Sequence, residues 1–377
     1  MKERSVSHSK KPNRNGFRLQ PLPPAVELES RAILRQLSLA HRYLAELKGM
    51  ATTIPNESIL INTLTLQEAK DSSEVENIIT THDELYRDSL FRDYARNPAA
   101  KEVNDYATAL RVGFEKIRED GLITVNRLLE IHRVLEQNDA GLRKLPGTEL
   151  KNERTGEIVY TPPQDYETII TLMSNLERFI NDSEMLDADP LVKMAVIHYQ
   201  FESIHPFYDG NGRTGRILNI LYLVAQRLLD IPILYLSRYI IRTKDAYYRK
   251  LQAVRDEEAW EAWIRHILEG VEQTAWETIG LIREIKLLMQ EYKHRIRSEF
   301  PKIYSQDLLN NLFRHPYTKI EFVQRNLRIS RITATKYLEQ LSQAGFIEKH
   351  KMGRNNYYVN QRLFSLLSLM QKSDRAS

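Results

Sequence analysis

Residues 205–216 read HPFYDGNGRTGR and place one histidine, one acid, two arginines and three glycines in a single short stretch. The whole chain contains only 14 glycines among 377 residues, so three of them in one charged loop call for an explanation. Glycine permits backbone conformations with positive φ, and successive N–H groups in such a loop can converge on one anion. This composition favours an anion-binding loop.

The residues at the end of this stretch have the chemistry of a phosphate site. The four that can form an anion nest are Gly210, Asn211, Gly212 and Arg213. The following run, RTGRILNILYLVAQRLL, predicts a helix, and the N–H groups and dipole of a helix N-terminus favour phosphate. Arg213 and Arg216 are three residues apart on the first turn and face the same side. Guanidinium groups match the geometry of phosphate oxygens.

Two residues at the start of the loop could supply the remaining chemistry. Asp209 could hold a divalent ion shared with phosphates, as one or two carboxylates usually do for Mg²⁺. His205 could act as a general base near pH 7, since a neutral imidazole accepts a proton. Phe207 is expected in the core. Each feature alone also has an ordinary explanation, because a His-Pro often caps a helix and a Gly-x-Gly is common in loops.

The loop as a whole resembles the Fic family pattern H-P-F-x-[D/E]-G-N-G-R-x-x-R at every specified position. The resemblance implies a helical fold whose members mostly transfer AMP from ATP, with Mg²⁺, to a Ser, Thr or Tyr hydroxyl of a protein. It implies that His205 is the catalytic base, that Asp209 is the metal ligand, and that Arg216 meets the γ-phosphate. The nucleotide-binding set that it implies is Glu76, His205, Gly210, Asn211, Gly212, Arg213, Thr214, Gly215, Arg216, Arg242 and Tyr247.

A short extended segment interrupts the helical pattern. NERTGEIVYTPP has a turn at Thr155-Gly156 and then an extended run that two prolines end, which predicts a hairpin-like flap. This flap resembles the strand with which the Fic family aligns the backbone of its target by β-addition. The flap residues predicted to contact the target are Glu157, Ile158, Val159 and Tyr160.

The sequence SSEVEN, residues 72–77, has two interpretations. Ser73 followed by Glu76 is a capping box, which would make Glu76 a device for starting a helix at 71–73. The same stretch resembles the inhibitory motif [S/T]-x-x-x-E-[G/N] of many Fic proteins. That resemblance implies that Glu76 pairs with Arg216 and keeps ATP in an unproductive position. It also leaves open that Glu76 positions a water that removes AMP.

The elements that must position these residues are mainly α-helical. The predicted fold is a Fic helical bundle with a short β-hairpin flap, an N-terminal helical region and a C-terminal winged helix-turn-helix. The predicted boundaries are a flexible basic tail at 1–24, an N-terminal helical domain at 25–99 with an inhibitory helix at about 71–80, a Fic domain at 100–296 and a winged-helix domain at 297–377. A long helix over 257–296 is expected to lead into the last unit.

Charge is distributed unevenly along the chain. Residues 1–18 carry a net charge of +5 and residues 301–377 carry +8, which leaves about −9 for the middle of a chain whose total is +4. Arg331, Thr333, Thr335 and Lys336 of the predicted turn pair could reach DNA. The basic residues around them are Arg325, Arg328, Lys349, Lys351 and Arg354.

Two classes of function therefore compete. The first is a protein adenylyltransferase that modifies a protein hydroxyl, including its own, and the second is a DNA-binding transcriptional regulator that uses the Fic body as a nucleotide sensor. Transfer of phosphate, UMP or phosphocholine is a third reading within the enzyme class. With no cysteine and no long apolar run, the sequence predicts a soluble cytoplasmic protein without membrane contact. It leaves a homodimer open.

Overall fold

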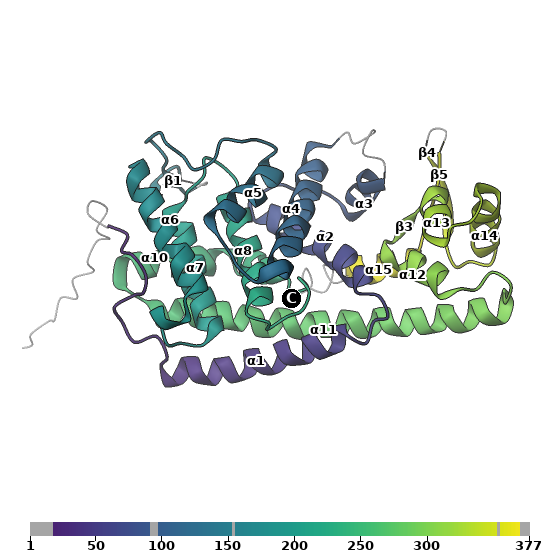
Figure 1. Ribbon diagram of the computed structural model, residues 1–377, viewed down its shortest axis with the longest axis horizontal. Coiled ribbons are helices and arrows are strands. Elements are labelled where there is room, and N and C mark those ends of the chain that lie inside the picture. The colour runs from purple at the N-terminus through teal and green to yellow at the C-terminus, as the bar shows by residue number, and fades with distance from the viewer. Residues whose placement is uncertain (1–17, 91–96, 153–154, 353–354, 370–377) are drawn as a thin grey trace, which may run out of the picture.

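The computed structural model describes residues 18–90, 97–152, 155–352 and 355–369, and the structural statements below concern those ranges. The chain is mainly helical, as predicted, with a large body and a smaller C-terminal module (Figure 1). The helices of the body are α1 (Arg31–Ala51), α2 (Glu57–Val75), α3 (His82–Leu90), α4 (Pro98–Asp120), α5 (Val125–Glu136), α6 (Tyr166–Asn181), α7 (Pro190–Ile204), α8 (Asn211–Ala225), α9 (Leu236–Arg242) and α10 (Lys244–Glu257). A short 3₁₀ turn, Ser183–Met185, links α6 to α7.

One 40-residue helix, α11 (Trp260–Glu299), runs from the body into the module, close to the predicted span of 257–296 (Figure 1). Helix α1 packs along it. At the far end, the Tyr292 hydroxyl of α11 donates to the backbone oxygen of Phe346, 2.8 Å away in the module. This helix therefore ties the two parts of the chain together.

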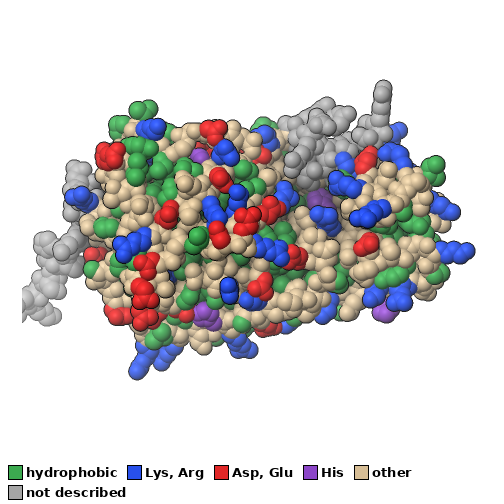
Figure 2. Space-filling view, viewed as in Figure 1, with side chains coloured by type: hydrophobic (Ala, Val, Ile, Leu, Met, Phe, Trp, Pro, Cys, Tyr) green, Lys and Arg blue, Asp and Glu red, His purple; other side chains and the backbone are tan. Residues whose placement is uncertain are grey.

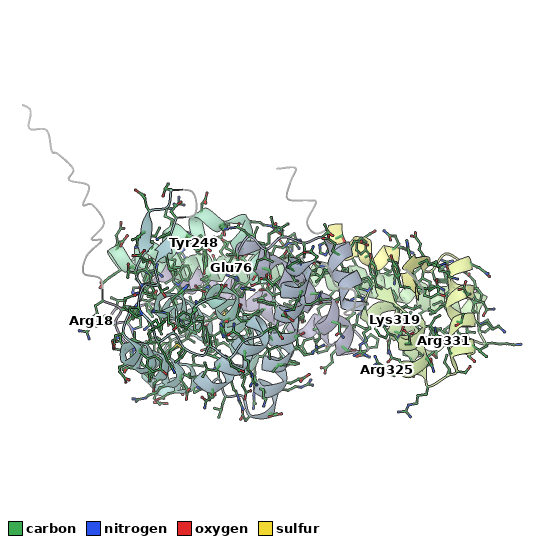
Figure 3. The ribbon with its side chains drawn as sticks, turned by 90° about the horizontal axis from the view of Figure 1, so that it is seen from above. Arg18, Glu76, Tyr248, Lys319, Arg325 and Arg331 are labelled. Atoms are coloured by element: carbon green, nitrogen blue, oxygen red, sulfur yellow. The ribbon has the colours of Figure 1, made fainter. Side chains whose placement is uncertain are left out.

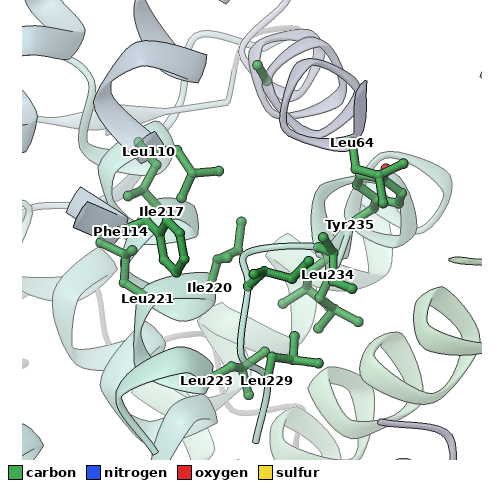
Figure 4. Packing of buried hydrophobic residues seen from close by; sticks show 14 of the residues in the cluster. Leu64, Leu110, Phe114, Ile217, Ile220, Leu221, Leu223, Leu229, Leu234 and Tyr235 are labelled. Carbon is green, nitrogen blue, oxygen red and sulfur yellow. The ribbon is translucent and has the colours of Figure 1, made fainter. Parts of the chain in front are cut away.

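Helix α7 lies at the centre of the body, and nearly every one of its side chains is buried. Helix α8 packs beside it and receives α4 on another face. Figure 4 shows Leu110 and Phe114 of α4 next to Ile217 and Leu221 of α8. The loop between α7 and α8 is thus held at both ends by helices that are fixed in the core.

Helix α2 differs from the prediction. One continuous helix spans Glu57–Val75, and Glu76 caps its C-terminus, so the helix expected to begin at 71–73 and the capping box at Ser73 are wrong. The helix continues because its polar residues find tertiary partners. Glu68, for example, accepts hydrogen bonds from the Ser237 backbone N–H at 3.3 Å and from the Tyr106 hydroxyl at 3.3 Å.

The C-terminal module has the predicted three short helices followed by two strands, and it adds a short strand after the first helix and a helix at its end. The turn pair is well capped, because the Ser330 hydroxyl accepts from the Thr333 N–H at 3.1 Å, and Gly345 takes a positive φ of 77° after α14. The strands form an antiparallel sheet in the order β3-β5-β4. The elements are α12 (Gln306–Arg314), β3 (Tyr317–Thr318), α13 (Ile320–Leu327), α14 (Arg331–Gln343), β4 (Glu348–Met352), β5 (Asn355–Val359) and α15 (Gln361–Leu369).

Within the described ranges, no helix is both long and apolar enough to cross a bilayer. Most of the basic N-terminal tail (residues 1–17) and Arg354 of the predicted wing lie outside the described residues.

Candidate active site

The loop between α7 and α8 has a fixed backbone. His205 ends α7 in the left-handed conformation, with φ 50°, and Gly210 precedes α8 with φ 70°. The buried Asn211 amide spans the loop, because it accepts from the Phe207 N–H and donates to the Phe207 carbonyl, both at 2.8 Å. Phe207 lies in the core, as predicted, and stacks on His132 with 3.7 Å between ring centroids.

All three glycines of residues 205–216 lie close to carboxylates, Gly215 to that of Glu202. A Cβ atom on Gly210 would collide with the Glu136 carboxylate, and one on Gly212 would collide with the Glu76 carboxylate. The N-cap position of α8, which Gly210 occupies, makes no side-chain capping bond. The first N–H groups of α8 therefore lie at an uncapped helix N-terminus, which is the arrangement that suits an anion.

A cavity of about 960 Å³ opens beside this helix terminus. Its lining includes His205, Gly212 and Arg216 from the loop and α8, and Tyr247 and Tyr248 from α10. The volume lies within the usual range for small-molecule sites, and the lining mixes cations, carboxylates and aromatic rings. The cavity is therefore large enough for a nucleotide.

The end of α2 binds Arg216 through two of the three guanidinium nitrogens. Its Nε donates to the Ser72 hydroxyl at 2.8 Å, and one terminal nitrogen donates to the Ser72 carbonyl at 2.9 Å and to Glu76 Oε1 at 2.8 Å. The Arg216 side chain is 2% exposed and that of Glu76 is 35% exposed. Figure 3 shows Glu76 in the body, near Tyr248 and far from the C-terminal module.

Arg216 and Glu76 each stabilise the ionised form of the other. Burial alone would raise the pKa of Glu76, but the charge and hydrogen bond of Arg216 outweigh it and hold the pKa below its usual value. Burial would likewise lower the pKa of Arg216, but Glu76 and Glu202 outweigh it and raise the pKa. Both groups are therefore ionised near neutral pH, and the pair occupies the guanidinium.

Arg213 is directed to different carboxylates. Its terminal nitrogens lie 2.9 Å from Glu136 and 3.2 Å from Glu102, and the side chain is 5% exposed. Asp209 lies 3.8 Å from the same guanidinium, yet its own side chain is 84% exposed. One Asp209 oxygen accepts from the Gly210 N–H at 2.7 Å. Neither Arg213 nor Asp209 belongs to the lining of the large cavity.

His205 is held as a neutral imidazole. Burial, with a further contribution from Arg143, lowers its pKa to about 4. Its Nδ1 atom is buried without a hydrogen-bond partner. A neutral ring that lines the cavity has a lone pair available to accept a proton.

Of the remaining predicted nucleotide contacts, some line the large cavity and others do not. Tyr247 lines the cavity, is 1% exposed, and its hydroxyl lies 2.8 Å from His198 Nε2. Thr214 is buried inside α8. Arg242 lies outside the cavity lining and forms an ion pair with Glu277 of α11.

The predicted flap is a two-stranded antiparallel hairpin, β1 (Leu150–Lys151) and β2 (Ile158–Tyr160). Ile158 and Val159 are 42% and 45% exposed, while Tyr160 is buried and donates its hydroxyl to the Ser203 carbonyl at 2.8 Å. Glu157 lies one residue before β2. Val159 and Tyr160 line the cavity, so the flap borders the same space as His205.

The sequence analysis missed three residues that shape the site. Arg143 is fully buried and donates to the His205 carbonyl at 2.8 Å, which fixes the loop. Arg255 packs its guanidinium 3.8 Å above the Tyr160 ring. Glu202 lines the cavity with one buried, unpartnered oxygen, and burial raises its pKa to about 7. No local motif marks these residues, because their partners are distant in the sequence.

Three family descriptions match parts of this chain. Residues 34–115 match the family described as "Fic/DOC family N-terminal", and residues 122–223 match "Fic/DOC family". Residues 288–363 match "Protein adenylyltransferase SoFic-like, C-terminal domain". The chain belongs to the Fic family, which confirms the resemblance inferred from the loop.

Similar proteins include the protein adenylyltransferase Fic of Aedes aegypti, which is 30% identical over 180 residues, and that of Culex quinquefasciatus, which is 31% identical over 180 residues. Each match covers 46% of this chain and 34% of the mosquito protein. The chain thus spans about a third of the length of these curated relatives.

Two solved structures share the fold. A Fic family protein from Desulfovibrio desulfuricans G20 has a TM-score of 0.57 at 19% identity, and the match covers 91% of this chain and 98% of the other. Fic-1 from C. elegans has a TM-score of 0.51 at 20% identity, covering 67% of this chain and 73% of the other. At these identities the likeness concerns the fold.

Proposed function

We propose that this protein is an adenylyltransferase that moves AMP from ATP to a Ser, Thr or Tyr hydroxyl of a protein, its own chain included. The observation that carries the proposal is that His205, Gly212 and Arg216 border one nucleotide-sized cavity at the start of α8. A base, an uncapped helix terminus and a guanidinium are the groups needed to accept a proton and to hold a triphosphate.

In this proposal the hydroxyl oxygen of the target attacks the α-phosphorus of ATP, the bond from that phosphorus to the bridging oxygen breaks, and pyrophosphate leaves. The hydroxyl proton passes to the His205 imidazole, which is neutral before the reaction. Arg216 and the first N–H groups of α8 bind phosphate oxygens and neutralise charge. The exposed edge of the flap aligns the backbone of the target through Ile158 and Val159.

Mg²⁺ fits the exposed carboxylate of Asp209. One Asp209 oxygen accepts from the Gly210 N–H while the side chain remains 84% exposed, and the described residues contain no group of three or more side chains, here or elsewhere, that could hold a metal without further ligands. Such a site suits an ion held by one carboxylate plus the phosphate oxygens of the substrate. When bound, Mg²⁺ neutralises phosphate charge during the transfer.

The position of a radioactive label in ATP tests this function. The test uses the Glu76→Gly variant, in which Arg216 is released from Glu76. This variant should become labelled when it is incubated with ATP labelled at the α-phosphate, whereas ATP labelled at the γ-phosphate should leave it unlabelled, because AMP keeps only the α-phosphorus. Label from the γ-position would instead show phosphate transfer. Transfer from α-labelled UTP at equal efficiency would contradict the preference for ATP.

The second candidate is a DNA-binding regulator, and the exposed surface of α14 favours it. Arg331 is 60% exposed in its side chain and Ile332 is 83% exposed, although Arg331 also pairs with Glu321 at 3.2 Å. Figure 3 shows Arg331 at the far end of the molecule from Glu76. A helix of this kind can enter the major groove.

A gel-shift assay separates the two candidates. If the module binds DNA, the wild-type protein should retard duplex DNA in a salt-dependent manner, and Arg331→Gln should weaken the shift. DNA binding without any nucleotidyl transfer by the Glu76→Gly variant would favour the regulator. Transfer without a DNA shift would assign the module to another role.

A further inference from the structure

A second cavity, of about 510 Å³, lies where the C-terminal module meets the body. One wall comes from α2 and α4, and the other comes from α12, β3 and α13. Helix α2 packs directly against α12, so the cavity sits beside a formed interface. None of the residues assigned above to catalysis or nucleotide binding lines it.

The charges around this cavity have one sign. Arg111 of α4, Arg314 of α12 and Arg325 of α13 line it, and no aspartate or glutamate appears among the described lining residues. Within the described ranges, none of the three forms an ion pair with a carboxylate. Figure 2 shows Lys and Arg side chains gathered over the module at the right of the molecule. Three unpaired cations from both walls attract an anion.

A buried polar atom and an aromatic ring complete the lining. Thr65 of α2 is 5% exposed, and its hydroxyl oxygen is buried without a hydrogen-bond partner in the structure. Buried hydroxyls normally have a partner, and a ligand atom in the cavity could supply one. Phe322 lines the opposite wall, and the Arg325 guanidinium lies 5.6 Å from its ring centroid.

We propose that this cavity binds a small phosphate-bearing ligand of about mononucleotide size. Guanidinium groups bind phosphate oxygens through paired, charge-assisted hydrogen bonds, and the volume falls within the usual range for small-ligand sites. The cavity is bounded on two sides by helices, which favours a small molecule over a nucleic-acid strand. The ligand contacts α2, the helix that ends at Glu76, but the site does not depend on the proposed transfer activity.

Calorimetric titration of the full chain tests the site, with inorganic pyrophosphate, AMP and a short single-stranded oligonucleotide as probes. The test variant is Arg111→Gln/Arg314→Gln, which removes one cation from each wall. The matched control is Arg35→Gln/Arg265→Gln, which removes the same charge from two exposed residues that line neither cavity and lie outside the C-terminal module. Thermal melting of both variants checks that they are folded.

Wild-type protein should bind pyrophosphate or AMP in two classes of sites, because the large cavity also takes phosphate. The test variant should weaken one class about tenfold or more, and the control should leave both unchanged. A stronger effect on AMP than on pyrophosphate would identify a nucleotide as the ligand, and an equal effect would identify a phosphate group alone. The proposal is overturned if both variants titrate like the wild type, or if only the oligonucleotide responds.

Discussion

Replacing Glu76 by glycine should raise self-modification by ATP strongly, because the substitution releases Arg216. In the structure Arg216 gives one terminal nitrogen to Glu76 at 2.8 Å, so the guanidinium cannot also clamp a γ-phosphate with that atom. We expect a rise of about tenfold or more, since removing a competitor worth about 1.4 kcal/mol changes an equilibrium tenfold. The rate of incorporation of α-labelled ATP into the protein measures it.

Glu74→Gly is the matched control. Glu74 lies two residues earlier on the same helix end, but it pairs with Lys70 at 2.9 Å and not with Arg216. This variant loses a carboxylate and gains a flexible residue without freeing the guanidinium, so its rate of self-modification should stay near the wild-type rate. Equal activation of both variants would mean that loosening of α2, and not release of Arg216, is responsible.

The melting temperature of Glu76→Gly should be lower than that of the wild type, although its rate of self-modification should be higher. Without Glu76, the almost fully buried Arg216 keeps its bonds to Ser72 but loses its nearest carboxylate, so the melting temperature without ligand should fall. ATP with Mg²⁺ should then raise the melting temperature of Glu76→Gly more than that of the wild type, because ligand binding stabilises the folded state in proportion to affinity. A larger ligand-induced shift in the wild type would contradict the proposal that Glu76 competes with ATP for Arg216.

The loop could be predicted from sequence because its parts are contiguous. His205, Asp209, Gly212 and Arg216 lie in one short stretch, and the helices on either side carry buried apolar residues. Backbone conformation alone then brings the imidazole, the helix terminus and the guanidinium to one place. The structure also places Glu76, at the end of α2, against Arg216. The spacing of these residues in the sequence does not predict this contact, which was expected only from the resemblance to the Fic family.

Two other parts could not be predicted, for the same reason. The continuous course of α2 depends on polar side chains such as Glu68, whose partners Ser237 and Tyr106 are far away in the sequence. The local pattern therefore favoured a new helix that starts at 71–73. Arg143 stabilises the loop through the His205 carbonyl across 62 residues of sequence separation, and nothing in its own neighbourhood marks that contact. Long-range pairing of polar groups leaves no periodic signal.

Replacing His205 by alanine should abolish AMP transfer while ATP affinity stays within several-fold of its original value. The test is best made in the Glu76→Gly background, where transfer is expected to be fast enough to measure a large loss. Removal of a general base costs about 10²- to 10⁴-fold in rate. Transfer is followed with α-labelled ATP, and affinity is followed by calorimetry.

Arg216→Ala in the same background is the contrasting variant. It removes a group that we assign to phosphate binding, so it should weaken ATP affinity and transfer together. If His205→Ala loses affinity as much as Arg216→Ala does, then the imidazole has a binding role. If the His205→Ala variant transfers AMP at the full rate, then His205 is not the general base.

The pH profile of Glu76→Gly gives a signature that a structural role for His205 would not produce. The pKa of His205 is lowered to about 4, by burial first and then by Arg143, against a usual value of 6.5. Protonation removes the lone pair, so the transfer rate should fall as the pH drops through the pKa of the ring. The Glu76 charge raises this pKa and is absent from the variant, whereas bound triphosphate is negative and raises the pKa in its place. The acid limb of the nucleotide-bound variant is therefore expected in the range below 6.5. An acid limb above this range would assign the proton transfer to another group, such as Glu202, whose pKa is raised to about 7 by burial.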